Sequence, residues 1–451
     1  MKITIKFISL ILLTTFFLMG KEQLIKPNSK EFKRLFKNKN IMFIVLDASR
    51  WDHFSFNNYF RKTTPNIDKI AERSIIFKNT FCQAAYTLAS TGTLLTGLSP
   101  EFHNVTLLTS PPLSNKIQTI AELFKKKRYK TIAISGNPNF GKALGYDRGF
   151  DIFIDLYSKS LQVLAEEFIN PFKEIIKKHK NEKMFLYLHI REPHRHFLMP
   201  SPFLGTFQNK FKNQSNELIN LENKIKYSQK NNIEDIKFYN SLYDENLRYA
   251  DYIVGKLINI MKTSNIFKKT IIFIFADHGE SLGEHNLIGH GNILYNEVSK
   301  IPFILHIPEL NKKLEINDIK ITSDIFITLV DFYNLNYKYK YLSYGKNLFL
   351  LNKKRVIFTR GIEIKKNLTF AVIQYPYKLL ITFPSNNIEM YNINYDFKET
   401  RNIKSQNPII LKKLILKLQT HLKASRKITS KKNKAKFSKE EIKALKSLGY
   451  L

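Results

Sequence analysis

Three short runs of hydrophobic residues each lead directly into a polar side chain. Nearly every residue in the runs is apolar, which is typical of strands covered on both faces of a parallel sheet. The runs are Ile41–Leu46 before Asp47, Met184–Leu188 before His189, and Thr270–Ala276 before Asp277. In open α/β sheets, ligands bind beyond the carboxyl ends of the strands. We therefore expect these polar side chains to meet at one edge of a sheet.

Helical patterns separate the three runs. Apolar residues recur with helical spacing in segments 67–73, 117–127 and 243–258, and residues 129–135 indicate a further strand. The alternation predicts an α/β domain with a predominantly parallel central sheet over residues 38–345. Within it, residues 201–240 are rich in Asn, Lys and Gln and lack a clear period. We expect an insertion there, either a mobile lid over the site or a plain surface loop.

The pattern changes after about residue 345. Short strands of an antiparallel sheet are predicted at 355–359, 370–374, 378–382 and 389–393. A basic amphipathic helix follows at 409–422, then a Lys-rich linker at 425–436 and a last helix at 439–448. Residues 346–451 are therefore expected to form a small α+β subdomain with a basic tail.

The first twenty residues have the pattern of an export segment. Lys2 and Lys6 form a short basic region, and residues 7–19 are an apolar run of signal-peptide length. No A-x-A cleavage site follows, so a cleaved signal peptide and an uncleaved membrane anchor both stay open. Residues 21–37 are expected to be a polar linker. We predict an exported protein of the periplasm or cell envelope, either tethered to the membrane or released.

Composition narrows the classes of partner. The chain has 451 residues and a formal net charge of +34, with 72 Lys and Arg against 38 Asp and Glu. Because the basic residues are scattered, we expect a solvated basic surface rather than a nucleic-acid site; contact with an anionic lipid or polysaccharide is the alternative. The single cysteine, Cys82, excludes a disulfide framework and is expected to be a buried packing residue.

Three of the strand-end residues have the chemistry of a metal site. Asp47, Asp277 and His278 offer oxygen and nitrogen ligands that could share one divalent cation. Residues 87–97 place hydroxyl groups at the start of a predicted helix. The Thr87 hydroxyl, activated by a metal, could attack phosphorus or sulfur. The alternative is that Thr87 and Ser90 only cap the helix.

The order of several motifs resembles the sulfatase family of the alkaline phosphatase superfamily over about residues 38–451. The matching segments are Leu46-Asp47-Ala48-Ser49-Arg50, Thr63-Thr64-Pro65-Asn66-Ile67-Asp68, Thr87 to Gly97, His189-x2-Glu192-Pro193-His194, Asp277-His278-Gly279-Glu280 and Gly289-His290-Gly291. The resemblance implies an alkaline-phosphatase-like three-layer α/β/α fold with a small C-terminal α+β subdomain.

The resemblance also implies roles for individual residues. Asp47, Asp277 and His278 match the family's metal ligands, and Thr87 falls at the position of its nucleophile, where its oxygen would be a further ligand. His194 and His290 match positions that contact the substrate or protonate the leaving group. Arg50 is expected to contact the substrate anion, with an ion pair as the alternative. The outer residues Glu280, Glu284 and His285 are expected to orient the ligands or to serve the structure.

Departures from the family pattern change the expected chemistry. Sulfatases convert a Cys or Ser within a Cys/Ser-x-Pro-x-Arg motif into formylglycine, whereas this chain has Thr87-Leu88-Ala89-Ser90-Thr91. A threonine cannot yield that aldehyde, so formylglycine is not expected. The segment Ser135-Gly136-Asn137-Pro138-Asn139 lacks the Lys and His that bind sulfate in many sulfatases, and Ala48 replaces a second aspartate.

These observations predict a metal-dependent hydrolase of sulfate or phosphate esters with Thr87 as nucleophile. One alternative is a transferase that moves a phospho-substituent onto a surface glycan or lipid, and another is a catalytically silent exported binding protein. We expect one divalent ion, with Ca, Mg, Mn and Zn all open. A two-metal site is the other geometry, and its nearest extra ligands by sequence are His189, Glu192 and His196.

Overall fold

The computed structural model describes residues 29–158, 165–195, 197, 199–208, 220–225, 233–338, 344–351, 355–425 and 437–447. Its centre is a large sheet with the strand order β11-β2-β10-β6-β1-β5-β3-β4, to which β9 adds beside β2. The strands are β1 (Asn40–Leu46), β2 (Ile75–Phe81), β3 (Lys130–Ser135), β4 (Ile152–Asp155), β5 (Met184–Ile190), β6 (Thr270–Phe275), β9 (Lys300–Ile301), β10 (Phe303–His306) and β11 (Leu314–Ile321).

The sheet is predominantly parallel, as predicted. Strand β1 pairs in parallel with β5 on one side and with β6 on the other, whereas β10 runs antiparallel to both β6 and β2. Val45 of β1 lies opposite both His189 and Phe275, so the three strands end at nearly the same height. Strand β5 is longer than the predicted run 184–188, because it includes His189 and ends at Ile190.

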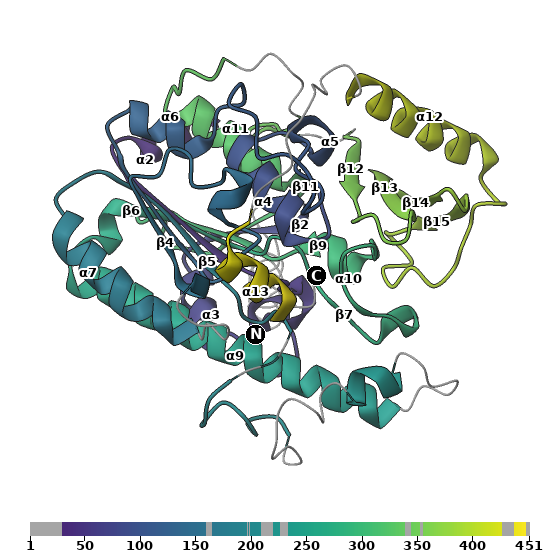
Figure 1. Cartoon of the computed structure of the whole chain (residues 1–451), viewed down its shortest axis with the longest axis horizontal. Helices are drawn as coiled ribbons and strands as arrows, with labels where there is room; N and C mark the ends of the chain where they lie inside the picture. Colours follow the sequence, from purple (N-terminus) through teal and green to yellow (C-terminus); the bar gives the residue numbers. More distant parts are fainter. Residues whose placement is uncertain are drawn as a thin grey trace, which may run out of the picture.

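Helices cover both faces of this sheet (Figure 1). Met42, Ile44 and Leu46 of β1 pack with one set of helices, while Ile41, Phe43 and Val45 pack with the other. The first set contains α3 (Pro65–Ala71), α7 (Ile169–His179) and α9 (Ile233–Thr263). The second contains α2 (Ser29–Phe36), α4 (Thr87–Thr96), α6 (Ile120–Lys126) and α11 (Thr322–Phe332). The three-layer α/β/α prediction is confirmed.

Two helices extend into segments that were expected to be irregular. Helix α2 occupies the described end of the predicted linker, and its Phe32 ring stacks on Phe349 at 4.0 Å between centroids. Phe36, from the same helix, is fully buried. Helix α9 begins at Ile233, inside the predicted insertion 201–240. The backbone N–H groups of Gly205 and Phe207 bond to the Glu245 carboxylate at 3.1 and 2.7 Å, which ties a further part of that segment to α9.

The C-terminal region forms a second, antiparallel sheet. Its order is β12 (Ile357–Arg360), β13 (Leu368–Gln374), β14 (Tyr377–Phe383) and β15 (Asn387–Asn392), and α12 (Pro408–Ser425) covers it through Leu414 and Leu418. This confirms the separate α+β subdomain. The last helix, α13 (Lys439–Ser447), returns to the catalytic domain, where its Glu441 carboxylate accepts a hydrogen bond from Ala143 N at 3.4 Å (Figure 1).

The predicted export segment, residues 1–20, lies outside the described residues. Among the helices of the described residues, none has the length and apolar character that a membrane crossing requires.

Candidate active site

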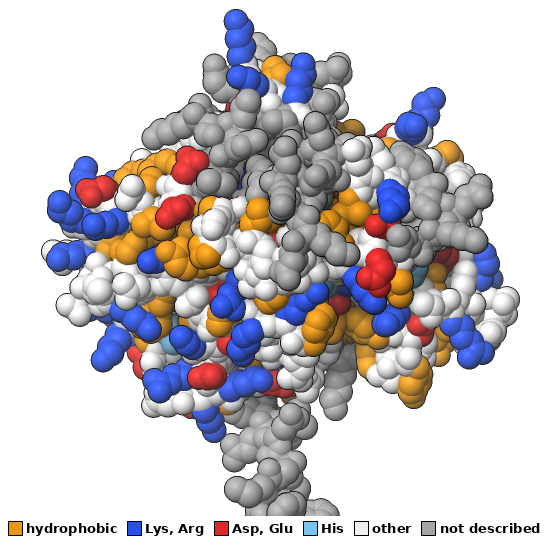
Figure 2. All heavy atoms as spheres, turned by 90° about the horizontal axis from the view of Figure 1, so that it is seen from below, with side chains coloured by type: hydrophobic (Ala, Val, Ile, Leu, Met, Phe, Trp, Pro, Cys, Tyr) orange, Lys and Arg blue, Asp and Glu red, His pale blue; other side chains and the backbone are white. Residues whose placement is uncertain are grey.

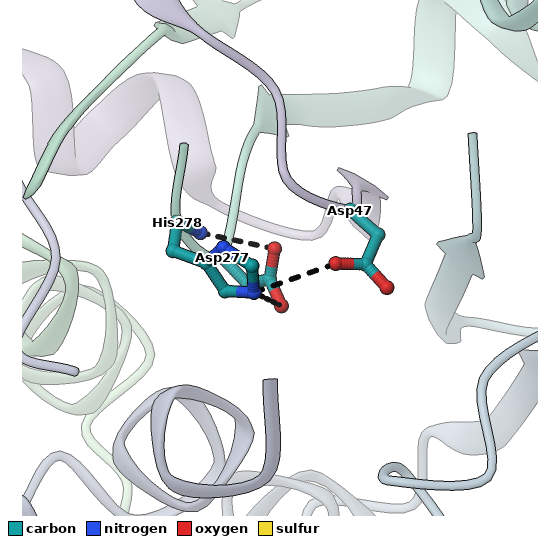
Figure 3. Close-up of side chains that lie close together, drawn as sticks. All are labelled: Asp47, Asp277 and His278. Atoms are coloured by element: carbon teal, nitrogen blue, oxygen red, sulfur yellow. Dashed lines mark hydrogen bonds and ion pairs between the residues drawn. The ribbon is translucent and has the colours of Figure 1, made fainter. Parts of the chain in front are cut away.

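The three predicted metal ligands meet at the carboxyl ends of β1 and β6. Asp47 follows β1 directly, and Asp277 and His278 follow β6, its neighbour in the sheet. One ligand atom from each side chain lies within 4.8 Å of the other two, and all three residues are fully buried. Figure 3 shows the Asp47 carboxylate and the His278 ring facing each other across this space, with the Asp277 carboxylate beside them.

The hydrogen bonds around Asp277 and His278 use one polar atom of each side chain and leave the other available for a metal. Asp277 Oδ1 accepts hydrogen bonds from Ala48 N at 3.2 Å and His278 N at 3.0 Å. Asp277 Oδ2 has no hydrogen-bond partner in the described part of the chain and lies 3.6 Å from His278 Nε2. His278 Nδ1 lies 2.9 Å from the carbonyl of Gly279 and must donate to it. That bond fixes the tautomer and leaves the lone pair of Nε2, which lies 3.5 Å from Asp47 Oδ1, available to a metal.

Charge gives a second reason why this donor set fits a cation. Burial and the neighbouring Asp47 carboxylate both raise the pKa of Asp277. Two buried carboxylates are costly to hold side by side without a positive partner. A divalent cation between Asp47, Asp277 and His278 would neutralise both, and mixed oxygen and nitrogen ligands suit several such ions.

Thr87 is positioned against this ligand set by the start of α4. Its Oγ1 lies 3.3 Å from Asp47 Oδ1 and 3.3 Å from His278 Nε2. The capping alternative does not describe the structure, because Tyr86 occupies the N-cap position and Thr87 is the first helical residue. Ser90, one turn later, donates a hydrogen bond to the carbonyl of Asp277 at 2.8 Å. Both hydroxyl groups therefore point at the metal-ligand cluster.

Asn137 is a site residue that sequence reasoning missed. Its Nδ2 donates a hydrogen bond to Asp47 Oδ2 and lies 3.5 Å from Thr87 Oγ1. In the sequence, the segment 135–139 is notable only for lacking the Lys and His that bind sulfate in many sulfatases. The strand-end rule could have found it, because Asn137 follows β3 by two residues and β3 ends at the same edge as β5.

Two histidines form the wall of the cluster. The rings of His194 and His290 lie 5.0 Å apart, and those of His278 and His290 lie 4.3 Å apart, measured between centroids. His290 Nδ1 contacts the Glu280 carboxylate at 3.1 Å, and although burial opposes it, this carboxylate raises the pKa of His290. Burial lowers the pKa of His194 to about 3, and its Nδ1 hydrogen-bonds to the carbonyl of Arg195. The site thus holds one imidazole that favours protonation and one that does not.

The residues named for a two-metal site have different positions. His189 Nε2 lies 3.8 Å from Asp47 Oδ2 and 3.9 Å from Asp277 Oδ2, and neither ring nitrogen has a hydrogen-bond partner among the described residues. Glu192 is buried, and burial raises its pKa to about 7. His196 lies outside the described residues. His189 is therefore the extra group that already faces the ligand set.

The Arg50 guanidinium pairs with two carboxylates and does not point into an open site. Its Nη2 lies 2.8 Å from Asp52 Oδ2 and its Nη1 lies 2.7 Å from Glu284 Oε1. Nη1 also donates a hydrogen bond to the Glu280 carbonyl at 3.3 Å. These contacts favour the ion-pair alternative, so Arg50 as a substrate contact stays a prediction without support from the geometry. Cys82 is fully buried, as expected for packing.

The loop that carries the metal ligands is supported from the C-terminal subdomain. Gly279 N and Glu280 N donate to the carbonyls of Val298 and Glu297, both within α10 (Asn296–Ser299). A Cβ at Gly279 would lie 2.1 Å from the Glu297 carbonyl oxygen, so only glycine allows this approach. Lys378 and Glu399 of the subdomain hold both ends of α10, and their side chains form a fully buried ion pair of 2.8 Å.

Comparison with known proteins assigns the family. The model of the Sulfatase family matches residues 39–334, which include the ligand set, Thr87 and both histidines. The chain belongs to the sulfatase family. Its relatives include phosphoethanolamine transferase EptA of Helicobacter pylori, which is 23% identical over 63% of this chain and 51% of that protein. Arylsulfatase of Clostridium perfringens is 22% identical over 66% of this chain and 75% of that protein.

Solved structures agree on the fold. BT4656 in complex with its substrate D-glucosamine-2-N,6-O-disulfate has a TM-score of 0.71 at 17% identity, over 86% of this chain and 98% of that one. The phosphonate monoester hydrolase of Agrobacterium radiobacter has a TM-score of 0.69 at 16% identity, over 87% of this chain and 96% of that one. The sulfatase fold is thus shared with proteins of different ester chemistry, while the chain spans about half the length of the matched transferase.

Proposed function

We propose that this sulfatase-family protein is a metal-dependent enzyme that cleaves phosphate or sulfate esters, with Thr87 as the nucleophile. The observation that carries the proposal is the position of Thr87 Oγ1, 3.3 Å from one atom of each of two metal ligands, Asp47 and His278. A hydroxyl used only for packing or capping has no need of this position. The family membership supports an ester substrate but leaves the group that is transferred open.

The nature of the nucleophile favours direct attack on phosphorus or sulfur. Threonine has a methyl group on its carbinol carbon, so it cannot become the aldehyde hydrate that sulfatases use. A divalent cation bound by Asp47, Asp277 and His278 would lower the pKa of the Thr87 hydroxyl and offset charge on the ester oxygens. Thr87 donates its hydroxyl proton towards Asp47 Oδ1, the nearest carboxylate oxygen. The new bond joins Thr87 Oγ1 to phosphorus or sulfur, and the bond to the leaving oxygen breaks.

Hydrogen bonding supports a division of the proton transfers between two histidines. The contact between His290 Nδ1 and the Glu280 carboxylate stabilises a protonated ring, which can give a proton to the departing oxygen. His194 donates through Nδ1 to a backbone carbonyl, so the lone pair of its Nε2 can accept a proton from water or an alcohol. The oxygen of that second nucleophile bonds to phosphorus or sulfur, the bond to Thr87 Oγ1 breaks, and the proton held by Asp47 returns to Thr87. Proton exchange with solvent resets the two histidines. The Asn137 amide donates to Asp47 and Thr87 and holds both in place.

A transferase reaction is the second candidate. It differs only in the second nucleophile, which would be an alcohol of a surface glycan or lipid in place of water. The observation in its favour is that a relative named as a phosphoethanolamine transferase is 23% identical to this chain over 63% of its length. With bis-p-nitrophenyl phosphate as donor, an added acceptor alcohol would separate the two reactions. A transferase should form the mixed phosphodiester in preference to hydrolysis, whereas a hydrolase should release mainly p-nitrophenyl phosphate.

The test uses p-nitrophenyl phosphate, its bis-ester and p-nitrophenyl sulfate, with the chain stripped by chelation and then given one divalent metal at a time. We expect turnover of at least one phosphate ester and its loss by about 1,000-fold or more in Thr87→Ala. Thr87→Ser is the matched control, because it keeps the hydroxyl. Mass spectrometry should find an adduct on the Thr87 peptide after a substrate pulse. Turnover that survives in Thr87→Ala would reject the assignment, and no turnover with any metal would favour a silent binding protein.

A further inference from the structure

A cavity with charged residues in its lining lies at the opposite end of the central sheet. It has a volume of about 920 Å³ and lies between the ends of α3 and α9, the residues that precede β6, and His306 at the end of β10. The strands place it far from the catalytic site, because Asp277 follows β6 whereas Phe267–Lys269 precede it. A six-residue strand spans about 20 Å. Helices α3 and α9 lie against the same face of the sheet in Figure 1.

The rim of this cavity is strongly cationic. Its basic lining residues are Lys69, Arg73, Lys262, Lys268 and Lys269, and Glu72 is the acidic one. Within the described part of the chain, none of these five cations forms an ion pair with a carboxylate. Figure 2 shows that Lys and Arg side chains on one face of the molecule are spread among acidic and hydrophobic ones. The cavity combines a concave shape with five cations in its lining, which favours a ligand with several negative groups.

The floor of the cavity requires something that phosphate or sulfate oxygens cannot supply. His306 is 5% exposed and lines the cavity, and its Nε2 is buried without a hydrogen-bond partner among the described residues. Its Nδ1 lies 3.3 Å from the Arg73 carbonyl and 3.3 Å from Ser74 Oγ, which gives its own proton to the Ile70 carbonyl. Nδ1 therefore carries the proton and Nε2 a lone pair. A donor such as a hydroxyl group would satisfy this lone pair once the ring turns towards the cavity.

Carboxamides complete the lining. Asn66, Asn259 and Asn265 also line the cavity. Asn66 Nδ2 donates to Asp251 Oδ2 at 2.8 Å, whereas the amides of Asn259 and Asn265 can both donate hydrogen bonds to a ligand and accept them. The shape of the cavity depends on a close helix contact, because a Cβ at Gly255 would lie 2.7 Å from Asn66 Cγ. Ile70, Ile258 and Phe267 supply apolar surface. Amides and an imidazole acceptor beside a cationic rim match a molecule that carries both hydroxyl groups and anionic groups.

We propose that this cavity is a second binding site, separate from the catalytic centre, for a sugar that carries two or more phosphate or sulfate groups. The cations bind the anionic groups at the rim, and His306 and the asparagine amides bind sugar hydroxyls below them. A free sugar bisphosphate and the end of a sulfated glycan chain share this chemistry. The proposal is independent of turnover, so it stands or falls separately from the catalytic role of Thr87.

The test is calorimetric titration of the full chain at physiological salt with three probes: fructose 1,6-bisphosphate, a heparin-derived sulfated tetrasaccharide and inorganic tripolyphosphate. We expect saturable binding of at least one sugar probe, weakened 10-fold or more in the triple variant Lys262→Ala/Lys268→Ala/Lys269→Ala. The matched control is Lys412→Ala/Lys413→Ala/Lys423→Ala, three exposed lysines of α12. It removes the same charge and should change the affinity less than 2-fold. Preference for the bisphosphate identifies a free sugar, and preference for the tetrasaccharide identifies a glycan chain.

Two results would overturn the proposal. An equal loss of affinity in both triple variants would mean that the probes bind through the overall net charge of +34 rather than in the cavity. Absence of saturable binding of either sugar probe at millimolar concentration would reject the site itself. A further variant, His306→Phe, examines the hydroxyl contact: it should weaken the sugar probe several-fold more than tripolyphosphate. If tripolyphosphate binds as tightly as the sugars and His306→Phe affects them equally, the ligand is not a sugar.

Discussion

The two ends of the central sheet hold charged groups in opposite ways. At the carboxyl end, Asp47, Asp277 and His278 are fully buried and each is fixed by neighbouring backbone or side-chain groups. At the amino end, the rim lysines Lys262 and Lys268 are exposed. A buried, fixed cluster suits one small ion at defined geometry, whereas exposed flexible cations adjust to a larger ligand. This difference fits the two proposals, a rigid reaction centre at one end of the sheet and an adaptable binding surface at the other.

The largest effect is expected where the carboxyl-end cluster loses a charge. Asp277→Asn keeps the shape and the hydrogen bonds to Oδ1 but removes the negative charge. We expect the variant to lose bound metal and at least 1,000-fold of its turnover, about 4 kcal/mol of transition-state stabilisation. Metal content per chain after gel filtration and kcat/KM measure the two effects. Lys268→Ala, at the other end of the sheet, is the control, and stoichiometric metal with near-normal turnover in Asp277→Asn would contradict the assignment.

The next effect concerns the support of the carboxyl end from the subdomain. Lys378 and Glu399 are both fully buried and pair at 2.8 Å. Lys378→Met leaves Glu399 charged without its partner, which should lower the free energy of unfolding by about 3–5 kcal/mol. Urea denaturation measures this change. The exposed Lys404→Met, in the same subdomain, should change stability by less than about 0.5 kcal/mol.

A double variant distinguishes loss of the pair from loss of packing. Lys378→Met combined with Glu399→Gln leaves no unpaired charge, so it should recover part of the stability lost in Lys378→Met alone. If the double variant is less stable than the single one by the full cost of a second substitution, the two side chains act independently and the pair does not join the subdomain to α10.

The strands that lead to the catalytic cluster could be predicted because strands buried on both faces are continuous apolar runs. These runs identify β1, β5 and β6, and the rule that ligands bind at the carboxyl ends of an open sheet predicts that Asp47 and Asp277 lie together. Strand β4 was not predicted, since Ile152–Asp155 is only half-buried and has no such run. Helix α2 was missed for a similar reason: two phenylalanines in a polar segment carry its packing.

Contacts between distant segments could not be predicted at all. Nothing in the local sequence of Arg50 indicates that Glu284 will meet its guanidinium, because the contact depends on how the loop after β6 folds back. The same holds for the approach of Gly279 to α10 and for the return of α13 to the catalytic domain. Asn137 lay within reach of the strand-end rule, but an amide has no distinctive spacing with a metal-ligand set.

A pH-dependent stability effect is expected near the amino end. Asp251 of α9 accepts hydrogen bonds from Asn66 N and Ile67 N at the start of α3, yet burial raises its pKa to about 6. Between its unfolded pKa of about 4 and this value, the folded state binds the extra proton. Stability from this group is therefore present below about pH 4 and is lost as the pH rises to about 6, by roughly 3 kcal/mol.

Asp251→Asn removes the ionisation and should flatten this dependence. Urea denaturation at pH 4, 5, 6 and 7 gives the difference in unfolding free energy between wild type and variant. We expect the variant to gain about 3 kcal/mol relative to wild type between pH 4 and pH 6.5, whatever its absolute stability. Parallel curves over this range would show that Asp251 ionises normally in the folded protein.

The smallest effects on turnover and stability should come from substitution of the amino-end cations, because these residues lie far from the catalytic cluster and are exposed. Lys262, Lys268 and Lys269 are exposed, and the length of β6 separates them from Asp277. Their replacement by alanine should change kcat less than 2-fold and the unfolding free energy by less than about 0.5 kcal/mol per site. Because truncation of an exposed lysine changes the stability of a protein little, any loss of ligand affinity in this triple variant can be assigned to the cavity. A 10-fold fall in kcat without added sugar would instead couple the two ends of the sheet and contradict their independence.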